Sequence, residues 1–308
     1  MIAWRSARIA ARDALAMPGL WPVALAGFLA RGGLVLFVAP VVVPPSLVAL
    51  ATFIGPASIT PTGPTTGLIV RIALGIGLLI AALLAGVVVG AIADVALISA
   101  GADGQRPGDR LLRRVVLIRL VSLLPVAVVF AIGIQRLGQI VYLELTLPTD
   151  LVTPIVIRVV AQAPEIVGAI LVAWIFGETW GGLATRLAVL RGDGAGRALA
   201  GGLGLFMRRI VAVLPLLAGS VLVAVLVLAV VIAAIAWSWD FVRDALLGGT
   251  GSGAIAVMAG STLLFVACWL AGLAIAGALA TWRAVAWTLV VGEDHRGSGR
   301  ADLERATL

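Results

Sequence analysis

The sequence predicts an all-α, polytopic integral membrane protein with about six transmembrane helices, arranged as three similar helical hairpins. Three features predict it: composition, long apolar segments and the distribution of arginine. Of the 308 residues, 62% are hydrophobic and only 12% are charged, whereas about a quarter of a soluble domain is charged. A soluble fold could not bury so much apolar surface, so we expect lipid around most of the chain.

Six segments are apolar over the roughly 20 residues that a helix needs to cross the hydrocarbon core. They are residues 20–44, 68–100, 116–135, 165–190, 210–237 and 255–291. The second and the sixth are longer than a crossing requires. We expect these two helices to tilt, or to continue past the membrane.

Arginine gathers in alternate connections between these segments. All 22 basic residues are arginines. They are concentrated before the first span, in 101–115, in 191–209 and in the tail, whereas 45–67 has no charged residue. The positive-inside rule then predicts that both termini and the arginine-rich connections are cytoplasmic.

The outer connection 138–164 differs from the other connections. It begins with residues that alternate in polarity, and three prolines follow. We expect an ordered outer cap with a short amphipathic helix near residues 152–161.

A weak triplication runs through the chain, because Gly90–Asp94, Gly181–Thr185 and Gly277–Thr281 are related. Small residues also recur at every fourth position of the second, fourth and sixth spans, which favours close helix packing in lipid. We therefore expect these three spans to form the inner core. The pattern predicts one transmembrane domain over 1–308, with repeat units near 1–104, 105–194 and 195–294 and a cytoplasmic tail at 295–308.

Five of the charged residues within the predicted spans are candidate intramembrane polar residues: Arg31, Asp94, Arg119, Glu178 and Arg186. An unpaired charge near the membrane centre costs at least ~2.5 kcal/mol, so each should face protein and have a partner. Similar depth predicts that Arg31 pairs with Glu178, and that Asp94 pairs with Arg119 or Arg186. Such pairs would fix helix register, or they would line a polar route for a proton, an ion or a headgroup.

Arg31 has a second distinguishing feature, because two glycines follow it directly. This segment is the one candidate for an interrupted transmembrane helix. Transporter binding sites typically have a pair of interrupted helices in matching halves of the chain, and this sequence contains no such pair.

The sequence argues against enzymatic and nucleic-acid-binding classes. It has one cysteine, Cys268, and one histidine, His295, and no cluster of carboxylates. No phosphate loop, dinucleotide fingerprint or zinc spacing occurs. We therefore predict no catalytic residues, no metal and no cofactor. No basic stripe is interleaved with aromatic residues, so nucleic acid is not an expected partner.

Arginine-bearing segments precede proline-marked spans at Arg113–Pro125 and Arg208–Pro215. With the long Gly/Ala-rich helices, this layout resembles uncharacterised bacterial six-span membrane proteins, including the membrane domain attached to some glycerophosphodiester phosphodiesterases. The resemblance implies a helical membrane fold and no activity, because the phosphodiesterase sequence itself does not occur in these residues. The lack of lysine suggests a GC-rich bacterial genome, and hence the bacterial inner membrane.

Three functional hypotheses follow. The first is a non-enzymatic scaffold or partner subunit whose arginine-rich inner face meets anionic lipid headgroups or a cytoplasmic protein. The second is a transporter or permease component with a polar route at Arg31, Asp94 and Glu178. The third is a lipid-modifying membrane enzyme. A water-accessible cavity at Arg31 or Glu178 would favour transport, whereas closed ion pairs would favour the scaffold.

Overall fold

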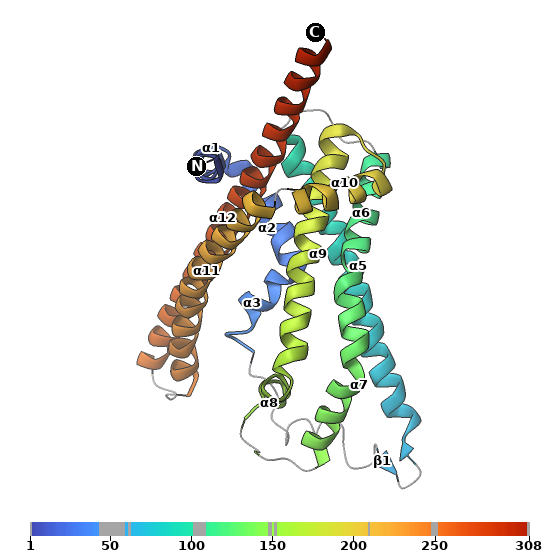
Figure 1. Ribbon diagram of the computed structural model, residues 1–308. Coiled ribbons are helices and arrows are strands. Elements are labelled where there is room, and N and C mark those ends of the chain that lie inside the picture. The colour runs from blue at the N-terminus through green and yellow to red at the C-terminus, as the bar shows by residue number, and fades with distance from the viewer. Residues whose placement is uncertain are drawn as a thin grey trace. The chain divides into compact units, whose positions relative to one another are not determined.

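The computed structural model describes residues 2–42, 59–60, 63–100, 109–146, 150, 153–208, 210–247 and 252–306 (Figure 1). This part of the chain is mostly helical and includes two two-residue strands, β1 (Ile59–Thr60) and β2 (Gly63–Pro64), which pair antiparallel. Six of its helical segments are long and apolar enough to cross a membrane: Pro18–Val38, Thr66–Ala100, Asp109–Leu145, Pro164–Arg191, Val213–Leu247 and Gly253–Leu289. The predicted all-α polytopic class is confirmed.

The first span is interrupted near its middle. It follows helix α1 and comprises the consecutive elements η1, α2, η2 and α3. Their bounds are α1 Ile2–Ala16, η1 Pro18–Leu20, α2 Trp21–Phe28, η2 Leu29–Gly33 and α3 Leu34–Val38. Within η2, a π-helical turn, Arg31 and Gly32 leave helical backbone angles, and Gly32 has a φ of +103°. Glycine adopts this left-handed conformation without a steric penalty, so Gly32 allows the interruption at the predicted place.

The third span is longer than the predicted 116–135. It combines α6 (Asp109–Ser122) and α7 (Leu124–Thr146), which meet at a turn at Leu123. Pro125 accounts for the turn, because it lacks the N–H that would continue the helical ladder. The segment of alternating polarity continues α7 as helix to Thr146.

The remaining helices are long, except for two short ones. Their bounds are α5 Thr66–Ala100, α8 Ile155–Gln162, α9 Pro164–Arg191, α10 Ala195–Arg208, α11 Ile210–Leu247 and α12 Ser252–Ala306. Helix α8 confirms the short helix expected near 152–161. The 55 residues of α12 correspond to about 80 Å of helix, far more than the ~30 Å hydrocarbon core. Most of the predicted tail is therefore a continuation of α12.

The chain divides into two compact units. The first comprises Met1–Val41, Gly86–Arg119 and Trp180–Leu308. In this unit α12 contacts α11, α2 and α1, and Figure 1 shows α11 alongside α12. One core cluster includes Phe37, Leu228, Val231, Ile235 and Ala276, and another includes Ile118, Leu183, Ala198, Val213 and Trp287.

The second unit comprises Val42–Ala85 and Leu120–Thr179. Within it α7 packs against α8. Gly177 of α9 lies so close to the carbonyl oxygen of Ser122 that a Cβ atom would collide with it. The small residue thus lets one backbone approach another, as expected for helix packing in lipid.

The same kind of close approach occurs in the first unit. A Cβ atom at Gly86 of α5 would collide with the carbonyl oxygen of Ala30, and one at Gly277 of α12 would lie 2.8 Å from that of Trp21. The common core of three even-numbered spans involves both units and stays a prediction. So does the division into repeat units, whose first boundary, at 104 and 105, lies outside the described residues.

Candidate functional site: an intramembrane charge cluster

Asp94 of α5 is the centre of an ion-pair cluster in the first unit. Nη1 of Arg31 donates to its Oδ1 at 3.1 Å and to its Oδ2 at 3.3 Å. Nε of Arg119 donates to Oδ2 at 2.9 Å, and Nη2 of Arg119 contacts the same oxygen. The predicted pairing of Asp94 with Arg119 is therefore observed, and both carboxylate oxygens are occupied.

Glycines bring the two sides of this cluster together. A Cβ atom at Gly27 of α2 would lie 2.7 Å from the Cβ of Ala93, and one at Gly90 of α5 would lie 3.5 Å from Cγ of Arg31. The interruption of the first span at η2 then aims Arg31 at α5. Its Nε donates to the carbonyl oxygen of Gly27 at 2.9 Å, which fixes the guanidinium in place.

The cluster is largely closed. The side chain of Asp94 is 11% exposed and that of Arg119 is 8% exposed, whereas that of Arg31 is 28% exposed. Arg119 belongs to the last turn of α6, where the partial negative charge of the helix end favours a cation. Two arginines therefore neutralise one buried carboxylate, and Arg31 is the most accessible of the three.

The acid that the structure places against Arg31 is Asp94, whereas we expected Glu178. Glu178 belongs to the second unit, and its pairing with Arg31 stays a prediction. Depth along the helix axis was the basis for that pairing. Arg31 lies in the η2 interruption, and its side chain points toward Asp94. The depth of a residue in the membrane does not predict this direction.

Arg186 has a different set of partners. Its Nη1 donates to the carbonyl oxygen of Gly182 at 2.9 Å, within α9. Its Nη2 donates to that of Ala284 at 3.1 Å, and its Nε to the hydroxyl of Thr288 at 3.3 Å. Arg186 thus joins α9 to α12 through neutral acceptors, and the alternative pairing of Asp94 with Arg186 is not among these bonds.

A second buried ion pair lies in the second unit and was not predicted. Arg158 of α8 contacts Glu144 of α7, and the two side chains are 7% and 3% exposed. Gln162 also donates to Glu144. Helices α7 and α8 pack against each other. An arginine on one of these helices and a glutamate on the other were the signal in the sequence that could have indicated this pair.

Two pockets are described, and both belong to the first unit. One is an apolar groove of about 460 Å³ between α1, α11 and α12. The other, of similar volume, lies at α9 and α10 and is lined by Arg191 and Arg208. Neither pocket is lined by Arg31, Asp94 or Arg119. Within the described residues, no group of three His, Cys, Asp or Glu side chains could hold a metal ion.

Comparison of the chain with protein families, curated proteins and solved structures found no match. The resemblance to the membrane domain of some glycerophosphodiester phosphodiesterases therefore stays an expectation.

Proposed function

We propose that this protein is a non-enzymatic scaffold or partner subunit embedded in the inner membrane of a bacterium. The closed cluster around Asp94 is the observation that supports this role. A charged residue inside a membrane is expensive and is retained when it fixes structure or serves a pathway. Here both carboxylate oxygens of Asp94 are bound by arginines from two other segments of the chain. This is the arrangement expected when a charge stabilises the packing of helices.

The proposed orientation has both termini in the cytoplasm. Six spans bring the two ends to the same side, and arginine-rich connections mark that side as cytoplasmic. Arg191 and Arg208 then line a pocket near the inner surface. These arginines would meet anionic headgroups or an acidic face of a partner protein.

A repeated architecture of three hairpins is part of the proposal. Thr185 and Thr281 are fully buried, and each hydroxyl donates to the glycine carbonyl four residues earlier, at 2.8 and 2.9 Å. Asp94 occupies the related position in the first hairpin and binds arginines instead. The charge cluster is then a specialisation of one repeat.

A transporter is the second candidate, and a specific observation favours it. The first span is interrupted at Arg31 and Gly32, and non-helical backbone at membrane depth is tolerated where protein or a water-filled cavity surrounds it. Arg31 is also the most exposed member of the cluster. In this alternative Arg31 and Asp94 would line part of a route for a proton or an ion.

Reconstitution separates the two candidates. The full chain is inserted into liposomes that contain a pH-sensitive dye, and a pH gradient is applied with and without a membrane potential. A scaffold should leave the proton flux at the level of empty liposomes, for the wild type and for Arg31→Gln. Release of headgroups or fatty acids from the same liposomes is measured by chromatography and should also be absent.

Proton flux above background that Arg31→Gln abolishes would overturn the scaffold proposal in favour of transport. Lipid hydrolysis would overturn it in favour of an enzyme. Arg136→Gln is the matched control for loss of one arginine, because the Arg136 side chain is 60% exposed and lies in the second unit.

A further inference from the structure

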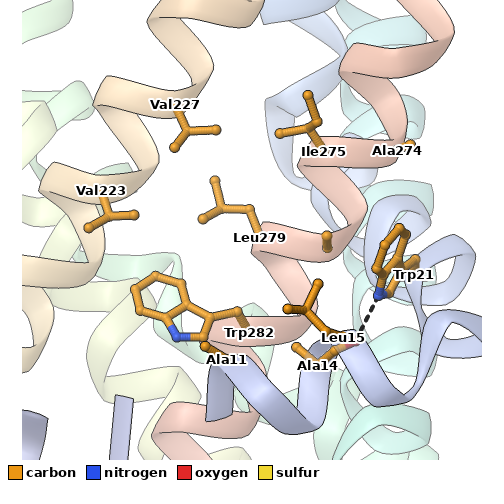
Figure 2. A pocket seen from close by; sticks show the side chains of 11 residues that line it. Ala11, Ala14, Leu15, Trp21, Val223, Val227, Ala274, Ile275, Leu279 and Trp282 are labelled. Atoms are coloured by element: carbon orange, nitrogen blue, oxygen red, sulfur yellow. Dashed lines mark hydrogen bonds between the residues drawn. The ribbon is translucent and has the colours of Figure 1, made fainter. Parts of the chain in front are cut away.

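The apolar groove between α1, α11 and α12 has no role in the charge cluster. Figure 2 shows aliphatic side chains from three helices around an open space, among them Leu15, Val227 and Leu279. Trp21 lies at one edge, where its indole N–H donates to the carbonyl oxygen of Ala14 at 2.9 Å. This bond ties α1 to the start of the first span, so the wall formed by α1 is fixed.

The groove lies near the start of the first span, which α1 precedes, and near the end of the sixth span. Helix α1 directly precedes the first span, and Trp282 lies two turns, or about 10 Å, from the end of the sixth span at Leu289. In the proposed orientation this end faces the cytoplasm. The groove would then open into the inner leaflet of the bilayer, with α1 at its headgroup edge.

Exposed arginines lie on α1, the helix that forms one wall of the groove. Arg8 and Arg12 are exposed on α1, and Arg8 lies two helical turns from Leu15 on the same side of the helix. Leu15 lines the groove and is 68% exposed. Helix α1 therefore places cations next to an apolar cavity, a pattern typical of basic helices that lie in the membrane interface and bind anionic lipid.

We propose that this groove holds an acyl chain of an anionic phospholipid of the inner leaflet, with the phosphate headgroup bound by Arg8 and Arg12. The aliphatic walls match a hydrocarbon chain. The arginines match a phosphate, which accepts charge-assisted hydrogen bonds from guanidinium groups. The volume of about 460 Å³ lies within the range of small-molecule sites. The inference requires a membrane protein with α1 at the inner surface, but not the scaffold role.

Native mass spectrometry of the full chain in detergent tests the headgroup. Dioleoyl phosphatidylglycerol is titrated into the protein, and dioleoyl phosphatidylcholine, a zwitterion whose choline offsets the phosphate charge, is the comparison. A single arginine near a membrane surface contributes about fivefold in affinity for anionic lipid. Arg8→Gln with Arg12→Gln should therefore weaken phosphatidylglycerol binding by up to about 25-fold and weaken phosphatidylcholine binding much less. Arg110→Gln with Arg113→Gln, two exposed arginines of α6, is the matched control and should change neither.

Filling the groove tests the acyl chain. Ala274 lines the groove and is exposed, so Ala274→Phe should occupy the space without disturbing the core. It should reduce the binding of both lipids at least tenfold. Ala271→Phe, at an exposed position on α12 that does not line the groove, is the control. Circular dichroism of every variant checks that the helices remain.

Several results would overturn the site. Wild-type protein that binds the two lipids equally would exclude the anionic headgroup. Unchanged binding in Ala274→Phe would exclude the groove as the seat of the chain, and would leave it as a surface for a helix of another protein. These outcomes are independent of the flux measurement, so the lipid site and the scaffold role can fail separately.

Discussion

Two buried ion-pair sites in the described part of the chain differ in what they connect. The Asp94 cluster joins η2, α5 and α6, whose contacting residues are separated by 63 and 25 positions in the chain. The Glu144–Arg158 pair joins α7 to α8, which are consecutive helices of the chain. Each is a carboxylate bound by arginine in a largely buried place. Only the first fastens distant segments to one another.

The comparison shows that a buried carboxylate bound by arginine can join either distant segments of the chain or two consecutive helices. Two guanidinium groups share Asp94, so removal of the carboxylate leaves two cations in a low-dielectric environment. One guanidinium faces Glu144, and Gln162 provides further polar contact. Loss of a buried partner is costly chiefly because it leaves the other charge uncompensated. The Asp94 cluster should therefore be the more sensitive of the two.

Asp94→Asn should have the largest effect. Asparagine keeps the shape but removes the negative charge that Arg31 and Arg119 share, and loss of one partner of a buried pair costs about 3–5 kcal/mol. We expect this loss in the free energy of unfolding, measured by denaturant titration in mixed micelles. The double variant Asp94→Asn with Arg119→Gln should recover part of the lost free energy of unfolding, because it also removes one of the two arginines that lack a counter-charge. A double variant that loses the sum of the single losses would contradict the shared cluster.

Glu144→Gln should have a smaller effect in the same assay, about 3 kcal/mol or less, because one arginine rather than two loses its counter-charge. The loss should be local to the α7–α8 region. Hydrogen exchange should accelerate in α8 and remain unchanged in α5. Faster exchange in α5 would contradict the difference in scale between the two pairs.

Gly86→Ala should cost about 1–3 kcal/mol, the usual range for an overpacked contact. Its Cβ atom would collide with the carbonyl oxygen of Ala30, next to the η2 interruption that aims Arg31. Gly75→Ala, on the same helix with open space around it, is the matched control. It should be neutral or stabilising by up to about 1 kcal/mol, because alanine favours a helix more than glycine does. Equal changes in the free energy of unfolding for Gly86→Ala and Gly75→Ala would contradict the close approach of α5 to Ala30.

The number and placement of the spans were predictable because hydrophobic length is a local property of the sequence. The interruption at Arg31 was also signalled, by the glycines that follow it. Asp94 was not predicted as a partner of Arg31. The depth of a residue along the membrane normal does not specify the direction in which its side chain points. The direction of Arg31 is seen only in the structure, where Gly27 of α2 lies close against Ala93 of α5 beside the interruption.

The Glu144–Arg158 pair was missed for a different reason. Alternating polarity around Glu144 drew attention to an outer cap, but α7 continues through that segment as a helix to Thr146. A helical period would have placed Glu144 on one face of α7. The packing of α8 against α7 then brings Arg158 to Glu144. Alternating polarity does not have the period of a helix, so it did not indicate this pair.

The exposed ion pair Arg136–Glu165 should contribute the least to the free energy of unfolding, less than either buried ion pair. Nη2 of Arg136 lies 2.7 Å from Oε1 of Glu165, which is as close as many buried pairs, yet the side chains are 60% and 50% exposed. An exposed ion pair contributes about 0–1 kcal/mol, because solvent screens the charges and both side chains lose freedom. A double-mutant cycle with Arg136→Gln and Glu165→Gln should therefore give a coupling energy below about 1 kcal/mol that declines in salt. A coupling as large as that of Asp94 with Arg119 would mean that burial is not what distinguishes these pairs.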